Sequence, residues 1–160
     1  MWFFMYACYL FSIISFLMLT TVFAQSLHPF YVFQASPMSF LILTSIIYLF
    51  TETLIMFFFV GTGVSIKEYT LEKNLEHTFH RQSISIKRKI YPPQLFNIII
   101  LMTAFVLFGA ADTQKIPHWI YPLSLFCGII HFMYAKRIQH ESFKKNTQII
   151  LDMVGIKRQL

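Results

Sequence analysis

The chain has 160 residues, of which 56% are hydrophobic and only 12% are charged. A soluble domain carries charge on about a quarter of its residues, so this composition excludes an ordinary soluble protein. The net charge of +6 comes from basic residues that flank apolar stretches and form no separate basic domain, so we expect no nucleic-acid partner.

Four apolar stretches follow one another along the chain, at about 2–24, 38–66, 94–111 and 117–135. Each approaches or exceeds the roughly 20 residues with which a helix crosses the hydrocarbon core of a bilayer. We therefore predict an all-α integral membrane protein: a four-transmembrane-helix bundle that forms a single membrane domain over residues 1–160. It has cytoplasmic helical extensions after the second and fourth helices.

The first stretch ends in Val22-Phe23-Ala24, which resembles the cleavage site of a secretory signal. However, no positive charge precedes the apolar run, and the run is longer than the core of a signal peptide. We therefore expect a retained transmembrane helix.

The two extensions are expected from helix-forming residues that follow the apolar stretches. The segment "SIKEYTLEKNLEHTFHR" contains no Gly or Pro, so the second helix should continue to about residue 80. Pro92-Pro93 should mark the start of the third helix, because proline fits a first turn. After the fourth stretch, residues 138–153 should form an amphipathic helix, with Phe143, Ile150 and Val154 resting on the membrane surface or on a partner.

Basic residues predict the orientation. Lys115 alone lies in a connection on one side of the four stretches, while the other twelve lysines and arginines fall in 67–92 or in the tail after 135. The positive-inside rule places those two regions and both termini in the cytoplasm of a bacterium, or in the matrix or stroma of an organelle. We therefore expect a multi-pass protein of the bacterial inner membrane, or alternatively of an organellar inner membrane. Anionic lipids should bind at the cytoplasmic face.

Glu52 lies near the middle of the longest apolar stretch. At 100° per residue it shares a helix face with Ser45 and Tyr48, and by depth Ser12 and Ser124 should be nearest to it. No Lys or Arg occurs in the four apolar stretches, so we expect Glu52 to be protonated and hydrogen-bonded to hydroxyl groups. A structural role and a role as a proton or ion site both remain open.

Other polar groups suggest weaker sites. His118 and His131 share one predicted helix but are rotated by about 140° from each other, so a haem b would need His28 on the outer surface. A metal site is conceivable on the cytoplasmic extension, although a solvated polar helix face explains its residues as well. The four residues of this site are Glu72, Glu76, His77 and His80.

The sequence contains no recognisable catalytic pair, so we expect no catalytic activity of its own. The first functional hypothesis is a small accessory or anchoring subunit of a larger membrane complex, which acts through helix packing with other membrane protein subunits. The alternative is a proton- or ion-linked transporter or channel that uses Glu52. A third possibility is a redox anchor that binds haem or quinone, although no cofactor is predicted.

Overall fold

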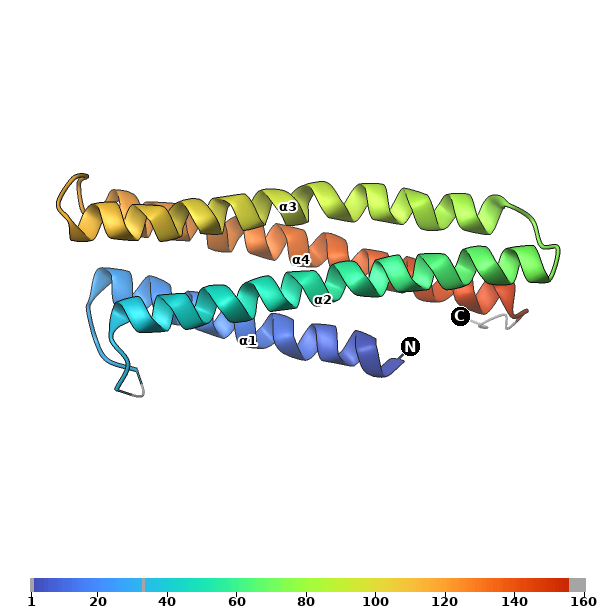
Figure 1. The fold of residues 1–160 in the computed structure, drawn as a ribbon, viewed down its shortest axis with the longest axis horizontal. Helices are drawn as coiled ribbons and strands as arrows, with labels where there is room; N and C mark the ends of the chain where they lie inside the picture. Colours follow the sequence, from blue (N-terminus) through green and yellow to red (C-terminus); the bar gives the residue numbers. More distant parts are fainter. Residues whose placement is uncertain (1, 33, 156–160) are drawn as a thin grey trace.

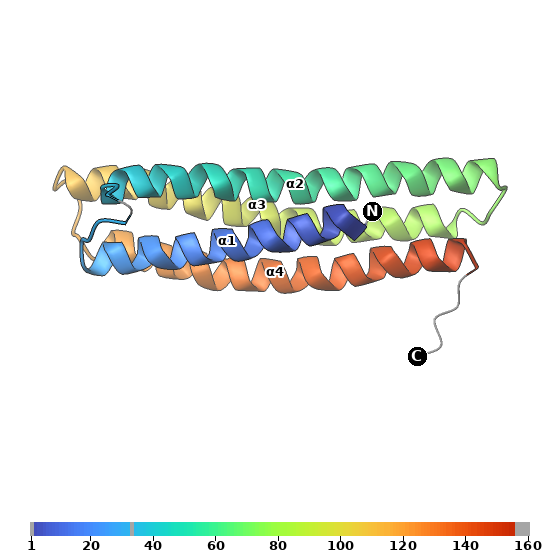
Figure 2. The ribbon, with the colours of Figure 1, turned by 90° about the horizontal axis from the view of Figure 1, so that it is seen from below.

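The structure is a computed structural model, and it describes residues 2–32 and 34–155. This part of the chain is all-helical, apart from one isolated bridge in a connection. Its four helices lie lengthwise beside one another (Figures 1 and 2). They are α1 (Trp2–Leu27), α2 (Pro37–Glu72), α3 (Thr78–Asp112) and α4 (Ile120–Met153).

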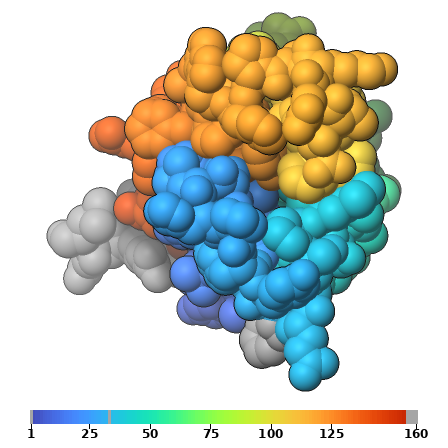
Figure 3. All heavy atoms as spheres, turned by 90° about the vertical axis from the view of Figure 1, so that its left-hand side faces the viewer, coloured from blue at the N-terminus to red at the C-terminus, as the bar shows by residue number. Residues whose placement is uncertain are grey.

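Each helix packs on its neighbours in chain order, and α4 also packs on α1. The α1–α2 connection, described over 28–32 and 34–36, and the connection 113–119 lie at one end of the molecule, at the left of Figure 1. We call this the upper end, and Figure 3 views it directly. The 73–77 connection and the end of α4 lie at the opposite, lower end. There α2, α3 and α4 extend beyond α1 (Figure 2).

Helices α1, α2 and α3 are each long and apolar enough to cross a membrane. In α4, the charged residues from Lys136 onward shorten the apolar stretch, so this helix is not apolar over enough of its length to count as a candidate membrane span. Large apolar side chains are exposed over much of the surface: Phe3 is 83% exposed and Val106 is 69% exposed. A soluble monomer rarely exposes so much apolar surface, which agrees with a membrane protein.

The face of α2 that was predicted to carry Ser45, Tyr48 and Glu52 points toward the other helices, although Ser45 is only half-buried. Cys8, Ser15 and Leu19 of α1 are at most 3% exposed, and in α2 the exposures of Tyr48 and Glu52 are both 1%. Helical periodicity therefore identified the inward side of α2 correctly. Buried apolar residues form three clusters along the long axis, with buried polar residues between them.

Two predicted helix boundaries are wrong. Helix α2 ends at Glu72 rather than near residue 80, because Asn74 takes a left-handed conformation (φ 49°) that asparagine tolerates and that breaks the helix. Helix α3 begins at Thr78, so Pro92 and Pro93 lie inside it and do not start it.

A proline inside a helix removes the hydrogen bond from its own nitrogen to the carbonyl four residues earlier. Pro92 and Pro93 thus leave the carbonyls of Arg88 and Lys89, two exposed residues, without their usual partners in the helix. Burial of Ile86, Ile90 and neighbouring residues on the inner face of α3 favours a continuous helix across this position.

Residues 138–153 are helical, as predicted, and they continue α4, which runs without a break from Ile120 to Met153. No Gly or Pro occurs between Gly128 and Gly155, so nothing interrupts the backbone. Phe143 does not rest on a membrane surface. Its ring packs on Phe58 and Phe59 of α2 at centroid distances of 5.0 Å each.

Candidate functional site

Glu52 occupies the centre of the most polar part of the interior. Its Oε1 accepts a hydrogen bond from Lys136 Nζ at 2.7 Å, and its Oε2 accepts one from Gln139 Nε2 at 2.9 Å. The Glu52 side chain is 1% exposed and that of Lys136 is 18% exposed. The pair is therefore an almost fully buried ion pair, in which a charge-assisted hydrogen bond joins α2 to α4.

This pair corrects the expectation that no cation is available to Glu52. Lys136 directly follows the fourth apolar stretch, and its side chain points back toward Glu52. The apolar stretch of α2 is longer than those of α3 and α4. Glu52, in the middle of the α2 stretch, therefore lies at the level where the apolar stretches of α3 and α4 have their lower ends. Glu52 was expected to be protonated because no positive charge was expected near it. That reasoning is therefore wrong.

All four helices contribute to this level of the interior. The Lys136 ammonium lies 4.8 Å from the centre of the Phe132 ring, a distance at which a cation is attracted to the ring face. Gln94 of α3 donates from Nε2 to the backbone oxygen of Glu52 at 2.7 Å. On the other side of α2, the Thr51 hydroxyl lies 2.8 Å from that of Ser15 on α1.

A second polar group lies one turn closer to the upper end. Asn97 Nδ2 donates to the Tyr48 hydroxyl at 2.7 Å, and Asn97 Oδ1 lies 3.0 Å from His131 Nδ1. His131 is therefore level with Tyr48, on the upper side of Glu52.

The predicted hydroxyl partners of Glu52 make other contacts. Ser45 Oγ donates to the backbone oxygen of Leu41, and Ser124 Oγ donates to that of Tyr121, so both bond within their own helices. Ser12 is half-buried and lines a crevice together with Lys136 and Gln139. The structure thus brings Ser12 near the ion pair but gives Glu52 none of these hydroxyls as a partner.

Sequence reasoning missed Lys136, Gln139 and Gln94 as partners of Glu52. A signal for Gln139 existed, because Gly128, Ala135, Gln139 and Ser142 share one face of α4 and are all buried. Ending the fourth stretch at residue 135 hid the continuation of this face. Gln94 directly follows the two prolines and looked like part of a helix start.

The histidines are spread along the molecule. His118 lines a cavity at the upper end with Gln25 and Asp112, His28 directly follows α1 at the same end, and His131 is bonded to Asn97 in the interior. His118 and His131 therefore occupy different levels of the structure.

The metal-site candidates are divided by the lower turn. Glu72 ends α2, Glu76 and His77 lie in the 73–77 connection, and His80 belongs to α3. Among residues 2–32 and 34–155, no three His, Cys, Asp or Glu side chains gather closely enough to hold a metal ion.

Comparisons of the chain with models of known protein families, with curated proteins and with solved structures found no match.

Proposed function

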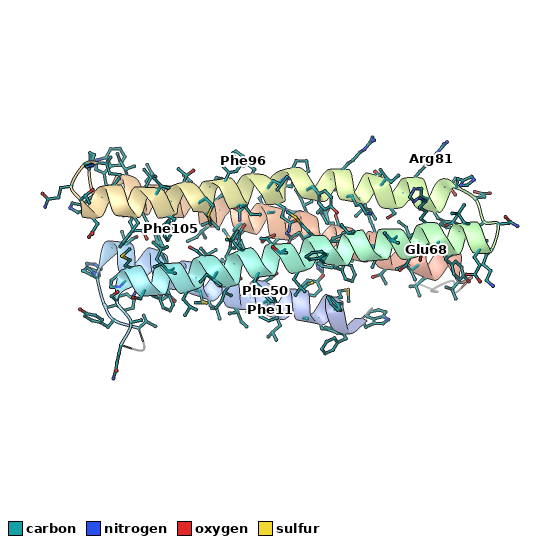
Figure 4. All side chains as sticks on the ribbon, viewed as in Figure 1. Phe11, Phe50, Glu68, Arg81, Phe96 and Phe105 are labelled. Atoms are coloured by element: carbon teal, nitrogen blue, oxygen red, sulfur yellow. The ribbon has the colours of Figure 1, made fainter. Side chains whose placement is uncertain are left out.

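We propose that all four helices cross the membrane, with both termini on the cytoplasmic side. The apolar part of α4 is shorter than the others, but α4 packs on both α3 and α1, two candidate spans. The basic residues after Ile66 in α2, in the lower half of α3 and after Ala135 in α4 support a cytoplasmic lower end. Figure 4 labels Glu68 and Arg81 at this end and Phe96 and Phe105 toward the other.

Within that orientation, we infer that the protein is an accessory subunit that binds a helix of another membrane protein. The observation that carries this function is a one-sided apolar surface at the lower end. Phe57, Val60 and Val64 of α2 are 67%, 44% and 47% exposed. At the same level, α3 and α4 expose charged residues such as Lys89 and Glu141, whose side chains are 3.1 Å apart.

This surface contains a groove of about 510 Å³ between α2 and α4. Its lining on α2 extends from Phe57 to Tyr69, about 18 Å or three helical turns at 1.5 Å per residue. Ile150 and Met153 of α4 form the opposite wall.

The shape of the groove indicates a helix as its occupant. Helix α1 lies along α2 and α4, and Phe4 of α1 borders the upper end of the groove. The groove therefore continues, toward the lower end, the surface of α2 and α4 on which α1 packs. A helix whose apolar residues are spaced three and four positions apart fits such a groove.

Two glycines allow a matched test. A Cβ added at Gly61, inside the groove, or at Gly109 on α3 would meet no atom within 4 Å, so neither Gly61→Leu nor Gly109→Leu disturbs internal packing. We expect complexes purified in mild detergent to retain a stoichiometric partner with Gly109→Leu and to lose it with Gly61→Leu. A photo-crosslinking residue at Tyr69 should attach to the same partner.

Two results would contradict the subunit function. One is an identical set of co-purifying proteins for both variants. The other is a Tyr69 crosslink to a second copy of this chain, which would make the groove a homodimer interface.

The buried ion pair supports a second candidate, proton- or ion-linked transport through Glu52. Ionisable residues inside membrane spans commonly mark proton and ion paths. The purified chain in liposomes should then move protons or cations, and Glu52→Gln should abolish this flux while the protein still folds. An inactive wild-type chain in liposomes would exclude autonomous transport.

A further inference from the structure

A second crevice, between α1 and α4, reaches the buried ion pair from the side of the molecule. Its volume is about 320 Å³. Ile13 and Met133, both lining residues, are 59% and 50% exposed, whereas Phe132 and Gln139 are at most 3% exposed. The crevice thus opens to the surroundings of the helices and ends at buried groups, as ligand sites commonly do.

The crevice changes in polarity along the molecular axis. Toward the upper end its lining is apolar, with Phe16 and Phe132 at a centroid distance of 6.1 Å. Toward the lower end it is lined by polar side chains, including Tyr9 and His140, whose hydroxyl and Nδ1 are 2.7 Å apart. A ligand with a polar head near the lower end and an apolar tail toward the upper end matches this gradient.

The charge at the base of the crevice selects the kind of head. Lys136 lines the crevice, and its ammonium carries three donor hydrogens, of which Glu52 accepts one. Because Glu52 already balances this charge, an anionic head would leave a net negative charge in a nearly buried place, which is costly. A neutral head that accepts a hydrogen bond from Lys136 adds no charge.

The walls favour a flat head. Four of the lining side chains, Tyr9, Phe16, Phe132 and Phe143, are aromatic, and flat rings pack well on aromatic walls. We propose that this crevice binds a quinone, a neutral ring with a carbonyl oxygen that accepts from Lys136 and an apolar tail toward Phe16. The opening at Ile13 and Met133 lets such a lipid-soluble molecule enter sideways.

Photolabelling of the full chain in detergent tests this proposal. The probe is an azido derivative of a 1,4-benzoquinone that carries a decyl chain, and its adducts are mapped by mass spectrometry. Adducts are expected within 9–16 and 132–143. An excess of decylbenzoquinone should prevent them, whereas decylbenzene and decanoate should not.

Two exposed positions on α1 provide a matched pair of variants. Ile13 at the mouth of the crevice and Leu17, which does not line it, are both 59% exposed, so neither substitution removes a buried side chain. Ile13→Trp should reduce labelling at least tenfold, and Leu17→Trp should not change it. Equal labelling of both variants, or equal competition by decylbenzene or decanoate, would overturn the proposal.

Discussion

Removing the Lys136 ammonium should destabilise the protein through the carboxylate that it leaves behind. In Lys136→Met the methylene stem is largely kept, but Glu52 retains only Gln139 as a side-chain donor. Breaking a buried ion pair on one side typically costs about 3–5 kcal/mol. The loss of stability is limited by the cost of protonating Glu52, because the variant can fold with this side chain neutral.

That limit can be calculated from a glutamate in water. Its ordinary pKa is about 4.3 and each pH unit corresponds to about 1.4 kcal/mol, so protonating it at pH 7 costs about 3.7 kcal/mol. We therefore expect Lys136→Met to lower the free energy of unfolding by about 3 kcal/mol at pH 7. The deficit should shrink as the pH falls toward 5, because protonation becomes less costly.

Reversible unfolding in mixed micelles, measured at several pH values, provides the assay. The double variant Glu52→Gln, Lys136→Met has no unpaired charge and should recover most of the loss at pH 7. Lys89→Met removes a lysine from an exposed pair instead and should change stability little. A Lys136→Met deficit that is absent at pH 7, or that does not depend on pH, would refute an ionised pair.

Other features give further predictions. Cysteines introduced at Gln34 and Gln114 should react with an impermeant reagent from outside the cell, and ones at Gln82 and Gln148 should not; the reverse pattern would invert the proposed topology. Gly128→Leu should cost about 1–3 kcal/mol of stability in micelles, because a Cβ there lies 3.3 Å from Ile100, while Gly109→Leu should cost little. Asn97→Leu should cost about 1 kcal/mol in the same assay, since it removes the partner of Tyr48 and His131. Lys89 lowers the pKa of Glu141 by hydrogen bonding and by its charge, so the small stabilisation from this exposed pair is complete above the ordinary glutamate pKa and is lost as the pH falls through the lowered pKa. Lys89→Met should raise this pKa in a carboxyl titration followed by NMR.

The sequence was sufficient to predict the helical class and the inward side of α2, because both depend on local composition and on the angle per residue. Tyr48 and Glu52, which share one face of α2 by their spacing, are both buried.

The partners of Glu52 could not be predicted in the same way, because they depend on how far each helix is shifted along its neighbours. That shift placed Lys136 and Gln139 at the level of Glu52, although apolar length alone suggested Ser12 and Ser124. It also moved His131 to the level of Tyr48. Relative displacement of helices is a tertiary property, set by packing over the whole length of α2, α3 and α4.

The two prolines inside α3 have a mechanical consequence. The backbone ladder lacks two successive hydrogen bonds there, so the helix bends more easily at this point than elsewhere. Gln94, which directly follows the two prolines, donates a hydrogen bond to the backbone oxygen of Glu52 and so links α3 to α2. The lower arm of α3, from Thr78 to Tyr91, is therefore joined to the rest of the helix at the point where its backbone bends most easily. A bend at this point would act on the Gln94 contact first, and so on the backbone of the residue that holds the buried charge.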